Sequence, residues 1–274
     1  MNAPLLPGPF WLIGCGNMAG AMLEGWLAKG LDPEQVTVIR PSGKAVAPGV
    51  RVLRLLPEDE VPALVMLGVK PQKLDEVAPL LAPVLDPNTI LISILAGVEQ
   101  GTLRGRFPAV RNIVKAMPNT PVRLGKGVTD LYSDSQDLAA RATVADLMGL
   151  LGHVEWFGEE PLFQIAGHLS AAGPAFLFRF IDALAYAGSV LGLPPDQSAR
   201  LALRMVEGAA ALAAGASEGP AQLAERVASP GGTTRAGLNV LDEAQALNRL
   251  VEETLRASSR RSLEMAEEAR RPSS

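Results

Sequence analysis

The chain has 274 residues, of which 48% are hydrophobic, and a formal net charge of −4. This length allows one large domain or two modest ones, and this composition excludes a largely disordered chain. The negative charge argues against nucleic acid as the main partner, because phosphate binding requires clustered cations. The first nine residues lack the basic start and the apolar core of a signal peptide, and no window reaches the ~20 apolar residues of a membrane span. With a single cysteine, Cys15, we expect a soluble cytoplasmic protein.

Short apolar runs alternate with helical stretches from residue 10 to about residue 128. These runs are residues 10–13, 36–39, 64–69, 89–95, 112–116 and 128–132. Continuous apolar strands that alternate with helices indicate a parallel sheet covered on both faces. The sequence therefore predicts an α/β fold whose N-terminal part is a Rossmann-type, doubly wound parallel sheet.

The second half of the chain has a different character, because strand signals end near Pro161 and Ala, Leu and Gly dominate. We expect residues 1–161 to form a dinucleotide-binding domain and residues 162–274 an all-α domain. Residues 167–193 are apolar nearly all round, and Gly173-Pro174 should break their helix. Such a helix must be buried on every side. A domain of this size has too few other residues to cover it completely. A homodimer formed through the C-terminal helices is therefore predicted.

A glycine turn follows the first predicted strand and opens a helix, with Gly14, Gly16 and Ala19 in the pattern G-x-G-x-x-A. Gly14 permits the tight turn, Gly16 lets a pyrophosphate approach the backbone, and Ala19 keeps the helix close to the sheet. The helix N-terminus adds free N–H groups and a positive dipole end. Dinucleotide binding is the interpretation we favour, and an ordinary βα turn is the alternative.

The end of the second predicted strand carries Arg40, Ser42 and Lys44, where an NAD-binding fold usually has an acidic residue. Two cations and a hydroxyl suit the 2′-phosphate of NADPH, which a carboxylate would repel. We expect NADPH as the cofactor, with NADH as the alternative. A solvated basic loop would explain the same residues without any ligand.

Six segments, in this order along the chain, resemble motifs of the pyrroline-5-carboxylate reductases. They are Gly14-Cys15-Gly16-Asn17-Met18-Ala19, Val69-Lys70-Pro71-Gln72, Ser93-Ile94-Leu95-Ala96-Gly97-Val98, Met117-Pro118-Asn119-Thr120-Pro121, Leu169-Ser170-Ala171-Ala172-Gly173-Pro174-Ala175 and Ser229-Pro230-Gly231-Gly232-Thr233-Thr234. The resemblance implies that hydride passes from NADPH to the C=N carbon of 1-pyrroline-5-carboxylate, giving L-proline, the last step of proline synthesis. It also implies homodimers and allows for larger assemblies of them.

The resemblance and the strand–loop order together assign residues to two sites. Cofactor contacts are expected from Gly14, Gly16, Asn17, Met18, Ala19, Arg40, Ser42, Lys44, Val69, Lys70, Pro71, Ala96, Gly97 and Asn119. The imino-acid substrate is expected at Ser229, Gly231, Gly232, Thr233 and Thr234, where backbone amides and a helix N-terminus can hold its carboxylate. By resemblance, the hydroxyl of Thr234 meets the ring nitrogen and is the catalytic candidate; N-capping by the two threonines is the alternative.

Three departures from the family pattern keep other functions open. Ala171 and Ala172 stand where the family usually has Gly-Ser, and His168 just before them is unusual. The alternatives are a reductase of a related cyclic imine and a non-catalytic or regulatory NADP-binding homologue. A β-hydroxyacid dehydrogenase is disfavoured, because residues 133–274 contain no lysine to act as its acid/base. With two histidines and no cysteine beside them, no metal site is expected.

Overall fold

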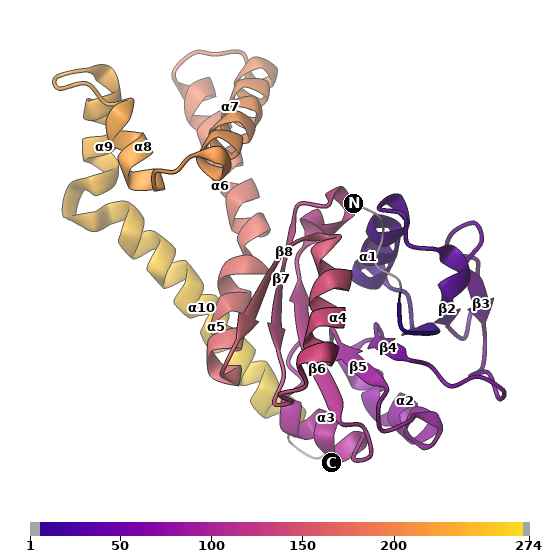
Figure 1. Cartoon of the computed structure of the whole chain (residues 1–274). Helices are drawn as coiled ribbons and strands as arrows, with labels where there is room; N and C mark the ends of the chain where they lie inside the picture. Colours follow the sequence, from indigo (N-terminus) through magenta and orange to yellow (C-terminus); the bar gives the residue numbers. More distant parts are fainter. Residues whose placement is uncertain (1–5, 271–274) are drawn as a thin grey trace. The chain divides into compact units, whose positions relative to one another are not determined.

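The computed structural model describes residues 6–270 and divides into two compact units. The first unit contains the chain up to Ala172 together with residues from Ser262 onward, and the second is Gly173–Arg261. Within the described residues, no helix is long and apolar enough to cross a membrane. Figure 1 labels the α-helices and most of the strands.

The first unit contains one eight-stranded sheet with the order β3-β2-β1-β4-β5-β6-β7-β8. Its strands are β1 (Phe10–Ile13), β2 (Val36–Ile39), β3 (Arg51–Leu53), β4 (Leu64–Leu67), β5 (Ile90–Ser93), β6 (Asn112–Pro118), β7 (Gly127–Tyr132) and β8 (Gly152–Phe157). All neighbours pair in parallel except β6 and β7, which are antiparallel. The predicted α/β class with its Rossmann-type sheet is confirmed.

Two edge strands and one reversal were not expected from the sequence. β3 has only three residues, half-buried or exposed, so it lacks an apolar run. β8 alternates between half-buried and exposed residues and lies at the other edge of the sheet. β7 runs antiparallel to β6, because a short 3-10 helix (Thr120–Leu124) and Gly125, with φ of +65°, turn the chain back on itself. Apolar periodicity does not reveal such a turn.

Helices cover both faces of the sheet in the first unit (Figure 1). These helices are α1 (Asn17–Ala28), α2 (Leu74–Leu81), α3 (Gln100–Arg106), α4 (Leu138–Gly149) and α5 (Glu160–Ser170). Residues of α1 and α4 join one apolar core with one face of the strands, and residues of α2 and α3 join a second core with the other face. α5 packs on β7 and β8, where Phe163 is buried against the rings of Tyr132 and Phe157.

Short 3-10 helices complete the first unit. They are η1 (Pro33–Gln35), η2 (Pro71–Lys73), η3 (Ala82–Val84) and η4 (Thr120–Leu124). The second unit is helical, with α6 (Gly173–Val190), α7 (Pro195–Gly215), α8 (Pro220–Arg226), α9 (Thr233–Asp242), η5 (Glu243–Gln245) and the start of α10 (Ala246–Arg270).

The predicted helix break is present, since α5 ends at Ser170 and α6 begins at Gly173. α6 packs on α7, yet no residue of α6 is buried within this chain. Large apolar side chains on it are open to solvent, Phe178 and Tyr186 among them. An apolar helix left uncovered in this way indicates a surface that a partner covers.

Candidate active site

The glycine turn between β1 and α1 has the geometry that a pyrophosphate requires. Gly14 has a φ of +81°, and a Cβ placed there would come within 2.8 Å of Val69 Cγ1. A Cβ on Gly16 would meet nothing within 4 Å, so the backbone there is open. Ala19 is buried, and its Cβ would lie 2.8 Å from a Cβ on Gly68, which shows how closely α1 approaches the end of β4.

The first turn of α1 offers backbone donors at this opening. Gly16 is the N-cap of α1, and no side chain caps the helix. The first internal bond of the helix is donated by the amide of Gly20 to the carbonyl of Gly16. The amides of Asn17, Met18 and Ala19 therefore have no acceptor from the helix itself. Together with the positive end of the helix dipole, they form an anion site at the carboxyl edge of the sheet.

The other predicted nucleotide contacts follow strands that end at the same edge. β1, β4, β5 and β6 are parallel neighbours, so the residues after them meet there. Lys70 is exposed and N-caps η2, which begins at Pro71, and Val69 and Pro71 are half-buried. Ala96 and Gly97 are exposed, and Gly97 has a φ of +74° with open space around it. The fold brings all of these residues to one side of the sheet.

Asn119 also lies at this edge, but its side chain has a structural use. The residue is 6% exposed. Its Nδ2 donates to the carbonyl of Ser170 (3.0 Å), and its Oδ1 accepts from the amide of Val128 (2.9 Å). One N–H of the amide group remains for any other contact. A contact from the Asn119 side chain to the amide group of a nicotinamide would therefore use that one hydrogen.

Cations gather at the end of β2. Arg40 is half-buried and lies beside the glycine turn. Burial raises the pKa of the Cys15 thiol in that turn, and the positive charge of Arg40 opposes the rise. Ser42 and Lys44 are exposed in the same loop, and the amide of Lys44 donates to Ser42 Oγ at 3.4 Å. A third cation, Arg54, follows β3 and lies against this loop. Sequence reasoning missed it, because only the β2–β3 pairing brings it there.

The Ser229–Thr234 segment lies in the second unit and leads into α9. Gly231 has a φ of +73°, which favours glycine, and a Cβ on Gly232 would lie 2.6 Å from Ser229 Oγ and displace that hydroxyl. Gly232 is the N-cap of α9, and neither threonine nor any other side chain caps the helix. The capping alternative for the two threonines is therefore wrong.

The free amides in this segment begin at Thr233. The amide of Gly232 is used inside the turn, where it donates to Ser229 O at 3.0 Å. The amide of Ala236 makes the first helical hydrogen bond of α9, to the carbonyl of Gly232. The amides of Thr233, Thr234 and Arg235 are the unbonded donors of the first turn. Both threonines are exposed. Arg235 is ion-paired with Glu225, so a carboxylate of the chain itself already engages its charge.

The protein itself fixes the surroundings of two residues near the end of α5, His168 and Ser170. Burial lowers the pKa of His168, which favours its neutral form. The hydroxyl of Ser170 is hydrogen-bonded to the buried carboxyl of Asp130. Ala171 and Ala172 form the turn that follows.

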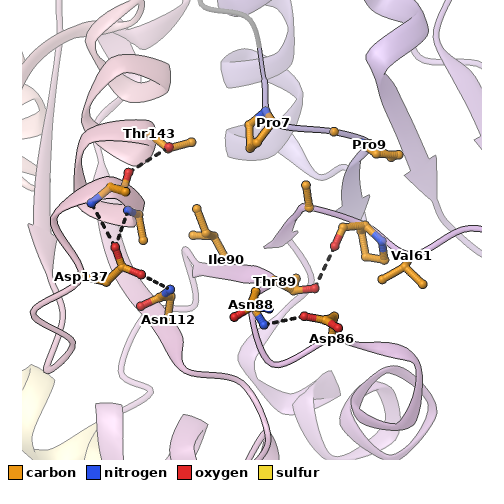
Figure 2. Close-up of a pocket in the computed structure, with 15 residues that line it drawn as sticks. Pro7, Pro9, Val61, Asp86, Asn88, Thr89, Ile90, Asn112, Asp137 and Thr143 are labelled. Carbon is orange, nitrogen blue, oxygen red and sulfur yellow. Dashed lines mark hydrogen bonds between the residues drawn. The ribbon is translucent and has the colours of Figure 1, made fainter.

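A pocket of about 480 Å³ lies at the opposite, amino edge of the sheet (Figure 2). Its polar side chains are occupied by the chain itself. Asp137 caps α4 and accepts from Asn112, Asp86 accepts from the amide of Asn88, and Thr89 donates to the carbonyl of Pro62. Within the described residues, no group of three metal-ligating side chains is found anywhere.

A glycine turn opening on an uncapped helix, at the carboxyl edge of this sheet order, defines a dinucleotide-binding protein of the Rossmann type. Two family models match the chain. Pyrroline-5-carboxylate reductase dimerisation matches residues 160–265, and NADP oxidoreductase coenzyme F420-dependent matches residues 10–97.

Individual relatives cover nearly the whole chain. A pyrroline-5-carboxylate reductase of Pseudomonas aeruginosa is 35% identical over 93% of this chain and 96% of its own, and one of Synechocystis is 36% identical over 93% and 97%. The structure of the Coxiella burnetii enzyme aligns with a TM-score of 0.86 at 30% identity over 94% and 98% of the two chains. The Plasmodium falciparum enzyme, solved with NADP bound, gives a TM-score of 0.81 at 26% identity over 96% and 100%. The chain belongs to the pyrroline-5-carboxylate reductase family, and the resemblance found in the sequence is confirmed.

Proposed function

We propose that the protein reduces 1-pyrroline-5-carboxylate to L-proline with NADPH, the last step of proline biosynthesis. NADPH supplies a hydride for the C=N carbon, and the ring nitrogen keeps or gains one proton. The single observation that carries the proposal is the pair of uncapped helix starts, one after Gly16 and one after Gly232. Each presents unbonded amides that can hold an anion, the pyrophosphate of the cofactor at the first and the substrate carboxylate at the second. The family relationship supplies the reaction.

The residues at the carboxyl edge fit a phosphorylated dinucleotide. The open backbone at Gly16 leaves room for a pyrophosphate, and Arg40 and Lys44 form no ion pair within the described part of the chain. An NADH-specific site would need a carboxylate acceptor for the ribose hydroxyls at this point, and the loop has none. Val69, Lys70, Pro71, Ala96 and Gly97 are the proposed neighbours of the nicotinamide half.

The substrate carboxylate is proposed to bind the amides of Thr233 and Thr234, with Ser229, Gly231 and Gly232 shaping the turn. Thr234 is the proposed catalytic residue: its hydroxyl hydrogen-bonds the ring nitrogen and orients the C=N bond. Because a threonine hydroxyl is a weak acid, we assign it positioning of the imine rather than full proton donation. Its exposed position at the start of α9 supports this role.

The proposal includes a homodimer formed through the helical half. The uncovered apolar face of α6 and the match to a dimerisation model support it. We keep residues 1–161 as the cofactor part and residues 162–274 as the substrate and dimer part, and we place the protein in the cytoplasm, where the lone Cys15 needs no partner. Assembly of dimers into larger oligomers is a further part of the proposal, which the family resemblance supports.

Turnover tests the proposed reaction. Purified protein is mixed with 1-pyrroline-5-carboxylate and either NADPH or NADH, and nicotinamide oxidation is compared with L-proline formed. Equal amounts of both, with a higher kcat/KM for NADPH, are expected. Turnover only with other cyclic imines would assign the protein to a related reductase, to which Ala171 and Ala172 could adapt the pocket. Tight NADPH binding without any turnover would indicate the regulatory homologue.

A further inference from the structure

Arg54 is held beside the basic loop after β2 by backbone pairing. Ile39 pairs with Leu53, and the amide of Arg40 donates to the carbonyl of Leu53 at 2.9 Å. The next residue on each strand is therefore an arginine, Arg40 on one and Arg54 on the other. Neighbouring strands lie about 4.8 Å apart, so the two side chains begin within reach of one ligand.

The side chain of Arg54 lies over Gly43, in the middle of that loop. A Cβ on Gly43 would be 2.7 Å from Arg54 Nε and 3.1 Å from its Cγ. Gly43 has a φ of +61°, and its amide closes a turn on the carbonyl of Arg40 at 3.0 Å. The missing side chain at Gly43 therefore lets the guanidinium of Arg54 lie against the turn that carries Arg40, Ser42 and Lys44.

The charge of this cluster is not balanced by the protein. Among the described residues, Arg40, Lys44 and Arg54 take part in no ion pair. Arg51, three residues before Arg54, is different: its Nη2 contacts both carboxylate oxygens of Glu60, at 2.6 and 2.8 Å. Three cations at one turn repel one another, and a multiply charged anion would relieve that repulsion.

We propose that Arg54 is a third ligand of the 2′-phosphate of NADPH and a determinant of the preference for NADPH over NADH. The inference rests on the proposed function for its cofactor and deepens it. A guanidinium can bind a phosphate with two parallel hydrogen bonds, which a lysine cannot do. Arg54 thus adds a second guanidinium to that of Arg40, from the residue that follows β3, and Lys44 adds a point charge from the β2 loop.

The test measures binding of 2′,5′-ADP and of 5′-AMP, which differ only in the 2′-phosphate, to the full chain by calorimetry. Arg54→Gln should weaken 2′,5′-ADP binding by roughly 10- to 100-fold and leave 5′-AMP binding within about twofold. Arg54→Lys, which keeps the charge, should fall between the wild type and Arg54→Gln. The matched control is Arg51→Gln at the start of β3, which should change the affinity for neither ligand. Unchanged circular dichroism establishes that each variant is folded.

Several outcomes would overturn the inference. Equal loss of both ligands in Arg54→Gln would show that Arg54 stacks on the adenine, and no loss of either would show that it is a solvated side chain. Failure of the wild type to prefer 2′,5′-ADP would remove the subsite altogether. Because neither ligand carries a nicotinamide, this measurement does not depend on turnover. A protein that selects 2′,5′-ADP through Arg54 but reduces no pyrroline would refute the proposed reaction and leave this inference standing.

Discussion

The carboxyl group of Asp130, on β7, is hydrogen-bonded to the hydroxyl of Ser170, the last residue of α5. The same hydroxyl lies 3.0 Å from the carbonyl of Ala166, although it has one hydrogen to donate. When the carboxyl of Asp130 is protonated, it can donate to Ser170 Oγ while Ser170 donates to the carbonyl of Ala166, so both contacts are satisfied. Asp130 is 2% exposed, and burial is the main cause that raises the pKa of its carboxyl. The Ser170 contact and His153 oppose the rise, and Glu155 adds to it.

This pair predicts how the stability of the protein depends on pH. A carboxyl whose pKa is higher in the folded state binds more protons there, so the free energy of unfolding falls as pH rises from the unfolded pKa through the folded one. Asp130→Asn removes that dependence, because its amide donates to Ser170 Oγ at every pH. In denaturant unfolding from about pH 4 upward, the free energy of unfolding of the variant should therefore increase relative to that of the wild type as pH rises.

Asp137→Asn is the matched control for this measurement. The amides of Ala140 and Ala139, with Asn112, lower the pKa of Asp137, so its contribution to stability is present above the unfolded pKa and lost as pH falls. Relative to the wild type, Asp137→Asn should therefore lose most stability at neutral pH and least in acid. If both variants follow the same trend, the raised pKa of Asp130 does not govern the pH dependence.

The second prediction concerns Thr234. Thr234→Ala removes one hydrogen bond to a polarised ring nitrogen, which is worth about 1.5–3 kcal/mol, so kcat/KM for the pyrroline substrate should fall roughly 10- to 150-fold. The dissociation constant for NADPH, measured by fluorescence titration, should stay within about twofold. Thr234→Ser should recover most of the activity. Thr254→Ala, which removes a hydroxyl bonded to Leu250 O on α10, is the control and should keep full activity. Parallel loss of turnover and NADPH affinity would contradict the role given to Thr234.

The third prediction tests packing in α1. A Cβ on Gly25 would lie 2.7 Å from Leu151 Cδ2 and 2.8 Å from the carbonyl oxygen of Val122, which is backbone and cannot easily move. Gly25→Ala should lower the free energy of unfolding by about 1–3 kcal/mol. Gly20→Ala in the same helix meets only Cys15 Sγ at 3.8 Å, and better helix propensity should stabilise it by up to about 1 kcal/mol. Equal effects of the two substitutions in urea unfolding would rule out the steric explanation.

The fourth prediction concerns the apolar face of α6. Phe178 is 63% exposed in the single chain. If a second copy covers it, Phe178→Asp places a charge in that interface and should weaken the dimer by roughly tenfold or more, as measured by sedimentation. Leu138, 80% exposed at the start of α4, offers the control, because Leu138→Asp should leave the association unchanged. A monomeric wild type would refute the proposed homodimer.

Much of the fold and of the candidate site could be predicted because the signals are local. β1, β2, β4 and β5 are fully buried four-residue strands, so their apolar runs are continuous in the sequence. The turn at Gly14 and Gly16 needs glycine for reasons confined to a few neighbouring atoms. The helix break before Pro174 likewise follows from the chemistry of proline alone.

Only the tertiary structure decided the features that depend on residues far apart in the chain. β3 has no apolar run of its own and exists through its pairing with β2, which is what brings Arg54 to Gly43. The internal partners of Asn119 and the Ser170 contact of Asp130 join residues that are 9 to 51 positions apart in the chain. Sequence patterns record which face of an element is apolar, whereas charge balance and pKa depend on which side chains meet in space. The sequence by itself therefore determined the family and the buried strands of the sheet, whereas the structure determined the edge strands, the reversal of β7 and which polar groups remain free to bind.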